Sequence, residues 1–295
     1  MQNKKIDSVE IYPYIVVYKN LYKDIQKGYD LLKESTDNKD DNFFSKWTKW
    51  SQFGKYLDPV CEGYNLDQSR YAGVDKLVTH TKKQEDQKQF ILEILENFHL
   101  VTEDYTSRYN VNVDLDQIFL DRDGNKTKTW RFSGPSICKY HLPGEGDEKH
   151  EGMRYHSDYV RERGHEPGYN FAITALSYFN DDYKGGEIDF VIGKKMLKYK
   201  PEAGDYIVFP SGHPDFLTED GEVYLHGVFP NTVENKYFSR MYLEVYSDGT
   251  PEWYENEKKY GKEVWNSMQD QLRKEFRDAY PQRTKIKGGI RIWLI

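Results

Sequence analysis

Only two cysteines, Cys61 and Cys138, occur among the 295 residues of this chain. Two thiols are too few for a disulfide framework or for a zinc site built from cysteines, so both are excluded. The sequence also lacks an unbroken apolar run of membrane-spanning length, so we do not expect an integral membrane protein. The N-terminal apolar run is short and is interrupted by Pro13 and Lys19. We therefore expect a β-strand there rather than a signal peptide, and a cytoplasmic protein.

Basic residues are in the minority, with 42 Lys and Arg against 49 Asp and Glu and a net charge of −7. General binding to duplex nucleic acid needs a basic face, so we do not expect nucleic acid as a partner. Aromatic residues, in contrast, are abundant: 25 Tyr, 15 Phe and 6 Trp. They supply the apolar surface for a sizeable core, which excludes a disordered chain.

The composition changes near residue 129, and we expect three regions. Residues 1–128 alternate helix-like apolar stretches with charged connectors and are expected to pack on the core as a helical and mixed region. Residues 129–247 contain short Tyr-, Phe-, Ile- and Val-rich runs separated by Gly, Pro and Asp, which is typical of antiparallel strands. Residues 248–295 are expected to form a C-terminal helix and tail. The predicted class is α+β with a mainly β sandwich or barrel.

Three segments have apolar residues at helical spacing: residues 19–34, 86–106 and 255–279. We expect all three helices to cover one face of a sheet with their apolar sides. The predicted strands are residues 129–133, 136–141, 153–159, 170–179, 187–192, 196–200, 205–209, 223–228 and 236–246.

Residues 37–88 fit no regular template well. Trp47 and Trp50 lie there among charged residues. Their side chains either stack on a substrate or fill a gap between a helix and a sheet. We favour packing, because large aromatic side chains most often contribute to cores.

An H-x-D pair, His156 and Asp158, lies inside a predicted strand. Side chains two residues apart on a strand project from the same face, so both can reach one point. Imidazole and carboxylate are good ligands for a divalent first-row metal. The pair alone is weak evidence, because H-x-D arises often by chance.

A third ligand is available at His226, at the end of a later strand. His213 competes for this role, but it lies among Gly, Pro and Asp in a predicted turn, so we favour His226. Two histidines and one carboxylate on one side of an iron ion leave the opposite positions open, as an oxygenase requires. A structural zinc site would instead be closed by four protein ligands.

The motifs around these residues come in a distinctive order: Tyr140 in ICKYH, His156-x-Asp158, SYFN with Tyr178, Gly185-Gly186-Glu187, Gly204-Asp205 before FPS, His226-Gly-Val-x-Pro230, and Lys236. Together they resemble the iron(II)/2-oxoglutarate-dependent dioxygenases, specifically the prolyl 4-hydroxylase-like branch. The resemblance covers roughly residues 130–246. It implies a double-stranded β-helix core, which is a cupin-like jelly roll, with flanking helices on its larger sheet.

The resemblance implies that His156, Asp158 and His226 are the iron ligands and the catalytic centre. A Lys or Arg about ten residues beyond the second histidine binds the distal carboxylate of 2-oxoglutarate in this branch, and Lys236 occupies that place. Arg240 lies on the same side of the same predicted strand and offers a bidentate fork instead. We favour Lys236 because of its position.

The tyrosines Tyr178 and Tyr140 resemble those of the family's cosubstrate pocket. The implied reaction is oxidative decarboxylation of 2-oxoglutarate to succinate and carbon dioxide, coupled to hydroxylation of a substrate. Asp158 favours hydroxylation over halogenation, because related halogenases carry a small residue at that position. Fe(II) is the implied cofactor, 2-oxoglutarate and dioxygen are the cosubstrates, and L-ascorbate is an implied auxiliary reductant.

The expected substrate is a peptide, such as one with a peptidyl proline, or a small molecule. Two alternatives remain at this point. A cupin-like barrel can serve as an inactive binding or structural module, and an iron oxygenase can work without 2-oxoglutarate. The oligomeric state does not follow from the sequence.

Overall fold

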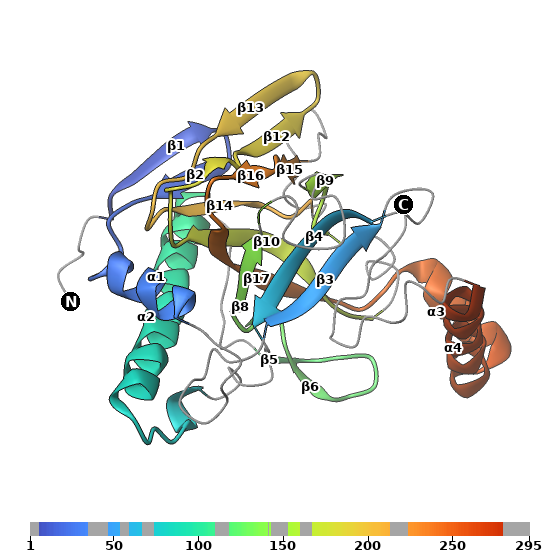
Figure 1. The fold of residues 1–295 in the computed structure, drawn as a ribbon. Coiled ribbons are helices and arrows are strands. Elements are labelled where there is room, and N and C mark those ends of the chain that lie inside the picture. Colours follow the sequence, from blue (N-terminus) through green and yellow to red (C-terminus); the bar gives the residue numbers. More distant parts are fainter. Residues whose placement is uncertain are drawn as a thin grey trace.

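Two antiparallel sheets form the core of the protein (Figure 1). The computed structural model describes residues 6–34, 47–53, 59–66, 74–109, 118–140, 142, 153–159, 167–212 and 224–279. The major sheet has nine strands in the order β1-β2-β14-β10-β17-β8-β4-β3, with β7 also paired to β17. The minor sheet has four strands in the order β13-β12-β15-β9. This is a double-stranded β-helix, so the predicted fold class is confirmed.

The strands of the major sheet are β1 (Ser8–Tyr12), β2 (Ile15–Tyr18), β3 (Trp47–Phe53), β4 (Pro59–Leu66), β7 (Trp130–Phe132), β8 (Ser136–Tyr140), β10 (Gly168–Tyr178), β14 (Tyr206–Pro210) and β17 (Lys236–Ser247). Those of the minor sheet are β9 (Met153–His156), β12 (Ile188–Ile192), β13 (Lys195–Tyr199) and β15 (Leu225–Val228). Two small ribbons pair β5 (Ile118–Leu120) with β6 (Lys126–Lys128), and β11 (Lys184–Gly185) with β16 (Asn231–Thr232).

Both faces of the major sheet are buried, and this explains why its central strands are apolar throughout. Ile15 and Val17 of β2 belong to the core between the two sheets. Val16 and Tyr18, on the opposite face, belong to the core under the helices. All four are at most 1% exposed, as expected when successive strand residues alternate between two packed faces.

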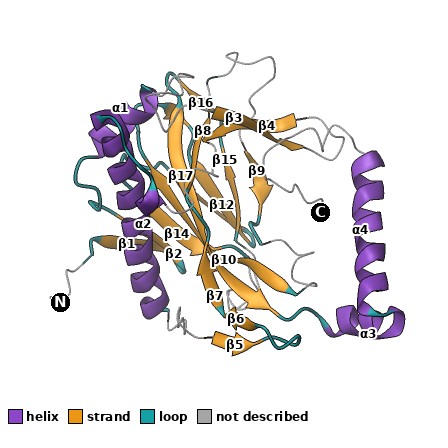
Figure 2. Cartoon of the chain, turned by 90° about the horizontal axis from the view of Figure 1, so that it is seen from below, coloured by secondary structure: helices purple, strands orange, loops and turns teal. Residues whose placement is uncertain are grey.

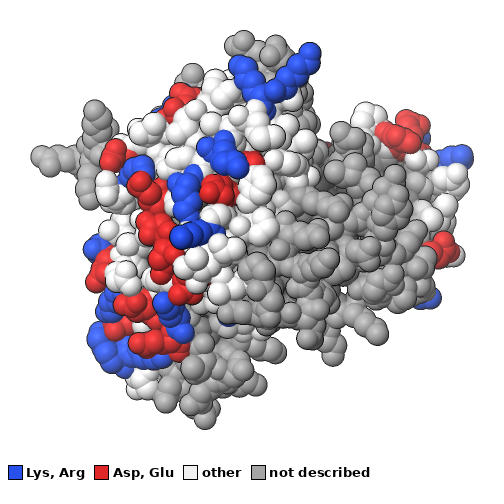
Figure 3. All heavy atoms as spheres, turned by 45° about the horizontal axis from the view of Figure 1, so that its top comes forward, with Lys and Arg blue, Asp and Glu red and all other residues white. Residues whose placement is uncertain are grey.

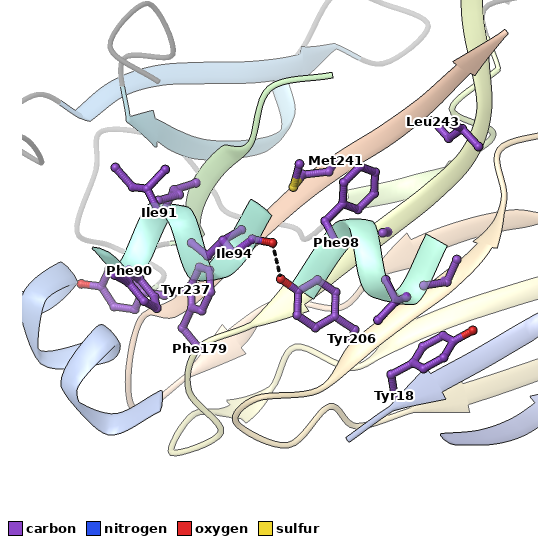
Figure 4. Packing of buried hydrophobic residues seen from close by; sticks show 14 of the residues in the cluster. Tyr18, Phe90, Ile91, Ile94, Phe98, Phe179, Tyr206, Tyr237, Met241 and Leu243 are labelled. Atoms are coloured by element: carbon purple, nitrogen blue, oxygen red, sulfur yellow. Dashed lines mark hydrogen bonds between the residues drawn. The ribbon is translucent and has the colours of Figure 1, made fainter. Parts of the chain in front are cut away.

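Helix α2 (Lys82–Arg108) covers the outer face of the major sheet (Figure 2). Its buried Phe90, Ile94 and Phe98 pack against residues of β10, β14 and β17 (Figure 4). The Tyr206 hydroxyl of β14 donates a hydrogen bond of 3.0 Å to the carbonyl of Ile94. The prediction of a helix over 86–106 is therefore confirmed, including the sheet face that it covers.

Helix α1 (Ile25–Lys33) is shorter than the predicted 19–34. The side chain of Asp24 accepts a hydrogen bond from the amide of Lys27 and caps the helix at that point. Its buried Tyr29 and Leu32 join the same outer core as α2.

The prediction for 255–279 is wrong in two respects. The segment forms two helices, α3 (Pro251–Tyr260) and α4 (Lys262–Ala279), separated by Gly261 with a positive φ of 84°. Its apolar stripe does not cover a sheet, because Val264 and Leu272 are 54% and 56% exposed. Figure 2 shows α4 on the opposite side of the sheets from α2. The periodicity correctly predicted that one side of the segment is apolar, but it did not show whether another element covers that side.

Each of the nine predicted strands overlaps a strand of the structure, and the N-terminal strand prediction is met by β1 and β2. Residues 37–88 contain β3 and β4, which we did not predict. The ring of Trp47 packs on Tyr237 at 6.0 Å between centroids, which favours the packing role; the Trp50 side chain lies outside what the structure describes. The division into three regions stays a prediction, although β2 pairs with β14 and β4 with β8 across the proposed boundary.

Acidic and basic side chains are interspersed on the face shown in Figure 3, and no continuous basic surface covers its described part. Within the described ranges, no helix has the length and hydropathy needed to cross a membrane.

Candidate metal centre and cosubstrate pocket

Three predicted ligands converge where β9 and β15 pair. His226 of β15 lies directly opposite His156 of β9, and their ring centroids are 4.4 Å apart. Asp158 follows two residues after His156; its two carboxylate oxygens lie 3.4 Å from His156 Nε2 and 3.6 Å from His226 Nε2. The donor atoms of all three residues lie within 4.8 Å of one another. The competing His213 lies outside the described residues.

A glycine next to His226 allows this close pairing. A Cβ added at Gly227 would lie 2.8 Å from the carbonyl oxygen of Met153 and 3.2 Å from the amide of Tyr155. Real Cβ atoms do not approach backbone so closely, so any larger residue would push β9 away from β15. The glycine of the His-Gly-Val motif therefore keeps His156 within reach of His226.

The protonation states of the group suit a metal ion. Burial lowers the pKa of His226 to about 4, so its imidazole is neutral at pH 7. Burial alone would raise the pKa of Asp158, but the imidazoles of His226 and His156 and a hydrogen bond from Thr174 hold it below its ordinary value. Metal ligands must be neutral imidazoles and ionised carboxylates, so His226 and Asp158 fit a divalent ion.

Two hydroxyl groups behind Asp158 orient its carboxylate. Thr174 of β10 donates to Asp158 Oδ2 at 2.8 Å, and its oxygen lies 2.6 Å from the hydroxyl of Ser211. Both residues are completely buried. Partners of this kind fix the direction of a ligand and raise metal affinity. Sequence analysis missed them, although a hydroxyl residue inside an apolar strand was an available signal.

A pocket opens beside the triad between the two sheets. The described residues that line it are Tyr140, Met153, His156, Asp158, Leu176, Tyr178, His226, Val228, Lys236, Phe238, Arg240 and Tyr242. Every residue predicted to bind iron or 2-oxoglutarate is therefore present in one pocket. Tyr242 was not predicted, although it follows Arg240 by two residues on the same strand face.

Lys236 is 1% exposed and lies among aromatic rings. Its Nζ is 4.8 Å from the ring centroid of Tyr178 and 5.5 Å from that of Tyr183, and it donates to the carbonyl of Gly186 at 2.5 Å. Burial and, to a smaller extent, the nearby Lys200 lower the pKa of Lys236 to about 7, against the opposing effect of Glu187. In the absence of an anion, the lysine is therefore only partly charged at neutral pH.

The Gly185-Gly186 pair lies next to the buried Lys236 and accepts a hydrogen bond from it. Both residues have positive φ angles, 70° and 67°, that only glycine adopts readily. In this conformation the carbonyls of Gly185 and Gly186 accept hydrogen bonds from Lys200 and Lys236. The Gly185-Gly186 pair thus also positions the buried lysine.

The remaining predicted cosubstrate residues surround Lys236 on neighbouring strands. Tyr140 of β8 is opposite Lys236 in the sheet register, and its hydroxyl lies 3.2 Å from Met153 Sδ. Tyr178 of β10 is opposite Phe238 and is 1% exposed. Arg240 lies four residues further along β17, opposite Leu176.

The comparison with protein families agrees with this geometry. Residues 139–246 match the family model described as the 2OG-Fe(II) oxygenase superfamily. The matched range includes His156, Asp158, His226, Lys236 and Arg240. No curated protein matches this chain.

Several solved structures are similar to this chain at low identity. The viral collagen prolyl hydroxylase of Paramecium Bursaria Chlorella virus-1, in complex with 2-oxoglutarate, has 13% identity and a TM-score of 0.44, covering 79% of this chain and 97% of that one. A prolyl hydroxylase from Trichoplax adhaerens has 13% identity and a TM-score of 0.46, covering 78% and 83%. The auxin-oxidising dioxygenase AtDAO1 of Arabidopsis thaliana has 14% identity and a TM-score of 0.48, covering 80% and 84%.

The resemblance stated from the motifs is confirmed by the family match. Residues 139–246 match the 2OG-Fe(II) oxygenase superfamily and contain the His156, Asp158 and His226 group, and these two findings support an iron(II)- and 2-oxoglutarate-dependent dioxygenase.

Proposed function

We propose that this dioxygenase hydroxylates an organic substrate while it converts 2-oxoglutarate to succinate and carbon dioxide. The observation that carries the proposal is the presence of the His156, Asp158 and His226 donors in the same pocket as the buried Lys236. The redox chemistry, which is the activation of dioxygen, comes from the ferrous ion when it is bound. The chain's own residues bind and orient the metal ion and the cosubstrate, and they exclude water from the pocket.

His156, Asp158 and His226 are the proposed ligands of that ion. Two imidazoles and one carboxylate make the facial triad of non-haem iron oxygenases, which leaves coordination positions open for cosubstrates. The neutral state of His226 and the ionised state of Asp158 favour metal binding by these residues. Thr174 keeps one carboxylate oxygen engaged and so restrains the rotation of Asp158.

Lys236 is the proposed partner of the distal carboxylate of 2-oxoglutarate. Its ammonium group is buried, and a charge-assisted hydrogen bond is strong where water is excluded. The carboxylate would replace the carbonyl of Gly186 as an acceptor or share Nζ with it. The hydroxyls of Tyr178 and Tyr140 are proposed to donate to the same cosubstrate.

Iron-dependent turnover of 2-oxoglutarate tests this function. Purified protein is supplied with Fe(II), 2-oxoglutarate, oxygen and ascorbate, and succinate is measured; leaving ascorbate out tests its proposed role as auxiliary reductant. We expect succinate formation that requires iron and that falls by at least about 10³-fold in His156→Ala and Asp158→Ala. The matched control is His80→Ala, because His80 is an exposed histidine outside the pocket.

Two results would contradict the proposal. Absence of iron-dependent succinate would favour a cupin-like binding module. Oxygen consumption that persists unchanged in Lys236→Ala and Arg240→Ala would favour an iron oxygenase that does not use 2-oxoglutarate. With turnover established, a gain of about 16 Da in candidate peptides and small molecules identifies the hydroxylated substrate, because one oxygen atom is inserted.

A further inference from the structure

Strand β9, which carries His156, has a short backbone ladder. It is the last strand in the order of the minor sheet, next to β15 (Figure 1). The described parts of the two strands pair at two positions, His156 with His226 and Met153 with Val228, and the register is irregular between them. Such an edge strand opens easily, because few backbone hydrogen bonds resist its movement. A metal ligand on this strand therefore needs a further support.

The side chain of Tyr155 supplies such a support on the face of the sheet that points away from the pocket. On this face Gly227 of β15 lies opposite Asp189 of β12, because each is the neighbour of a residue, His226 or Phe190, that points inward. A Cβ added at Gly227 would lie 3.1 Å from Cδ1 of Tyr155, so the tyrosine ring occupies the space over the glycine. The Tyr155 hydroxyl donates a hydrogen bond of 3.1 Å to Asp189 Oδ2. One side chain thus connects β9 to β12 across β15.

The carboxylate of Asp189 depends on this hydrogen bond. Asp189 is 1% exposed, and among the described residues Tyr155 is the hydrogen-bond donor to its side chain, whose Oδ1 has no partner. Lys198 lies opposite Asp189 in the register, but its Nζ lies over the ring of Phe229, 4.1 Å from the centroid. Loss of the donor to a buried carboxylate is costly, so the bond resists the movement of β9 away from the sheet.

We propose that Tyr155 and Asp189 are positioning residues, which hold β9 where His156 can bind the metal ion. The proposal rests on the function proposed above, because it concerns the same metal site. Neither residue lines the pocket, so both act through the strand that carries His156. Their effect is preorganisation: without the hydrogen bond, metal binding must also order β9, and the metal affinity falls by the cost of that ordering.

The first arm of the test follows hydrogen–deuterium exchange of the metal-free protein by mass spectrometry. Tyr155→Phe removes the hydroxyl and keeps the ring over Gly227, so we expect the paired amides of β9 to exchange about tenfold faster while those of β10 do not change. The matched control is Tyr109→Phe, which removes a hydrogen bond of 2.6 Å to the carboxylate of Glu10, outside the pocket and the minor sheet. Unchanged exchange in β9, or faster exchange throughout the chain, would overturn the proposal.

The second arm measures the Kd for Co(II) without oxygen, by competition with a chelator. We expect Tyr155→Phe and Asp189→Leu each to weaken Co(II) binding by about tenfold, and the double variant to bind no more weakly, because all three lose the same hydrogen bond. Asp189→Asn keeps an acceptor oxygen for Tyr155 and should bind Co(II) within about threefold of the wild type. If Asp189→Leu does not fold, Tyr155→Phe and Asp189→Asn carry this arm.

Three results of the second arm would overturn the proposal: wild-type affinity in Tyr155→Phe, additive losses in the double variant, or a loss in Asp189→Asn as large as that in Tyr155→Phe. Both arms need no turnover, and the first needs no metal ion. Absence of succinate from the wild-type protein would therefore contradict the proposed function and leave both readouts intact. Normal turnover together with unchanged exchange and affinity in Tyr155→Phe would contradict the positioning role alone.

Discussion

Burial has the same effect on two pocket residues that the sequence analysis selected. It disfavours the charged form of both His226 and Lys236. For His226 this gives a neutral imidazole ready to bind a metal. For Lys236 it gives an ammonium group whose charge depends on the arrival of an anion, so proton uptake and 2-oxoglutarate binding are coupled.

The first prediction concerns the pH dependence of that coupling. The pKa of Lys236 is about 7 before binding, and a carboxylate beside it raises this pKa. Below pH 7 the lysine is already protonated and contributes no pH dependence. Above pH 7, binding must take up a proton, so the Kd for 2-oxoglutarate rises toward about tenfold per pH unit.

Calorimetry of Mn(II)-loaded protein between pH 6 and 9 measures this effect. In Lys236→Arg the side chain stays charged throughout this range, so the slope should vanish even if the affinity falls. A wild-type Kd that does not change with pH, or the same slope in Lys236→Arg, would contradict the assignment of Lys236.

The second prediction concerns the hydroxyl behind the triad. Thr174→Val removes the hydrogen bond to Asp158 without changing side-chain volume much, so we expect metal affinity to fall by about 10- to 100-fold. Thr174→Ser retains the hydroxyl and serves as the control. Competition with a chelator measures the metal dissociation constants of both variants. Equal metal affinities in Thr174→Val and Thr174→Ser would show that the hydrogen bond to Asp158 does not contribute to metal binding.

At this scale, the sequence predicted residues whose chemistry is visible in a motif. His156, Asp158, His226 and Lys236 were selected because their order along the chain is distinctive, and all four lie in one pocket. Thr174, Ser211 and Tyr242 were missed, because in an apolar strand a hydroxyl residue or a tyrosine usually contributes only to packing. Their roles depend on which neighbours the sheet register places beside them.

At the scale of elements, the pairing of β9 with β15 brings together ligands that are distant in sequence. Gly227→Ala, the third prediction, would insert a Cβ 2.8 Å from the backbone of β9. We expect a loss of stability of about 1–3 kcal/mol and weaker metal binding, because β9 must move. In the control Gly134→Ala, the added Cβ has no atom within 4 Å. Thermal unfolding and metal titration give the readouts; unchanged metal affinity in Gly227→Ala would contradict this role for the glycine.

Elements were predicted well where the pattern depends on local sequence alone. The strand runs of residues 129–247 are bounded by turn residues, and every run overlaps a strand. Strands β3 and β4 were missed because β3 (WTKWSQF) has Lys, Ser and Gln where an apolar run was sought. The stripe of α4 was assigned to the core, yet Val264 and Leu272 are exposed, because periodicity shows an apolar face without showing what covers it.

At the scale of the whole molecule, the major sheet separates two cores with different tasks. The core between the sheets surrounds the pocket, whereas the core under α2 supports the sheet from outside. Ile94→Ala, the fourth prediction, removes a completely buried side chain of the outer core. We expect a loss of about 2–5 kcal/mol in the free energy of unfolding with unchanged metal affinity below the unfolding transition.

Leu100→Ala is the matched control on the same helix, because Leu100 is 39% exposed and should cost far less stability. Chemical denaturation measures both variants. A large loss of metal affinity in folded Ile94→Ala would show that the two cores are not independent.

We propose that His156, Asp158 and His226 hold one metal ion with open coordination positions. An oxygen-free titration with Co(II), followed by visible absorption, is the experiment that distinguishes this site from its alternatives. We predict one equivalent bound per chain, loss of binding in His226→Ala and retention in His213→Ala, with the weak absorption of a six-coordinate ion. Binding that survives in His226→Ala but not in His213→Ala, or the intense absorption of a tetrahedral site closed by four protein ligands, would contradict it.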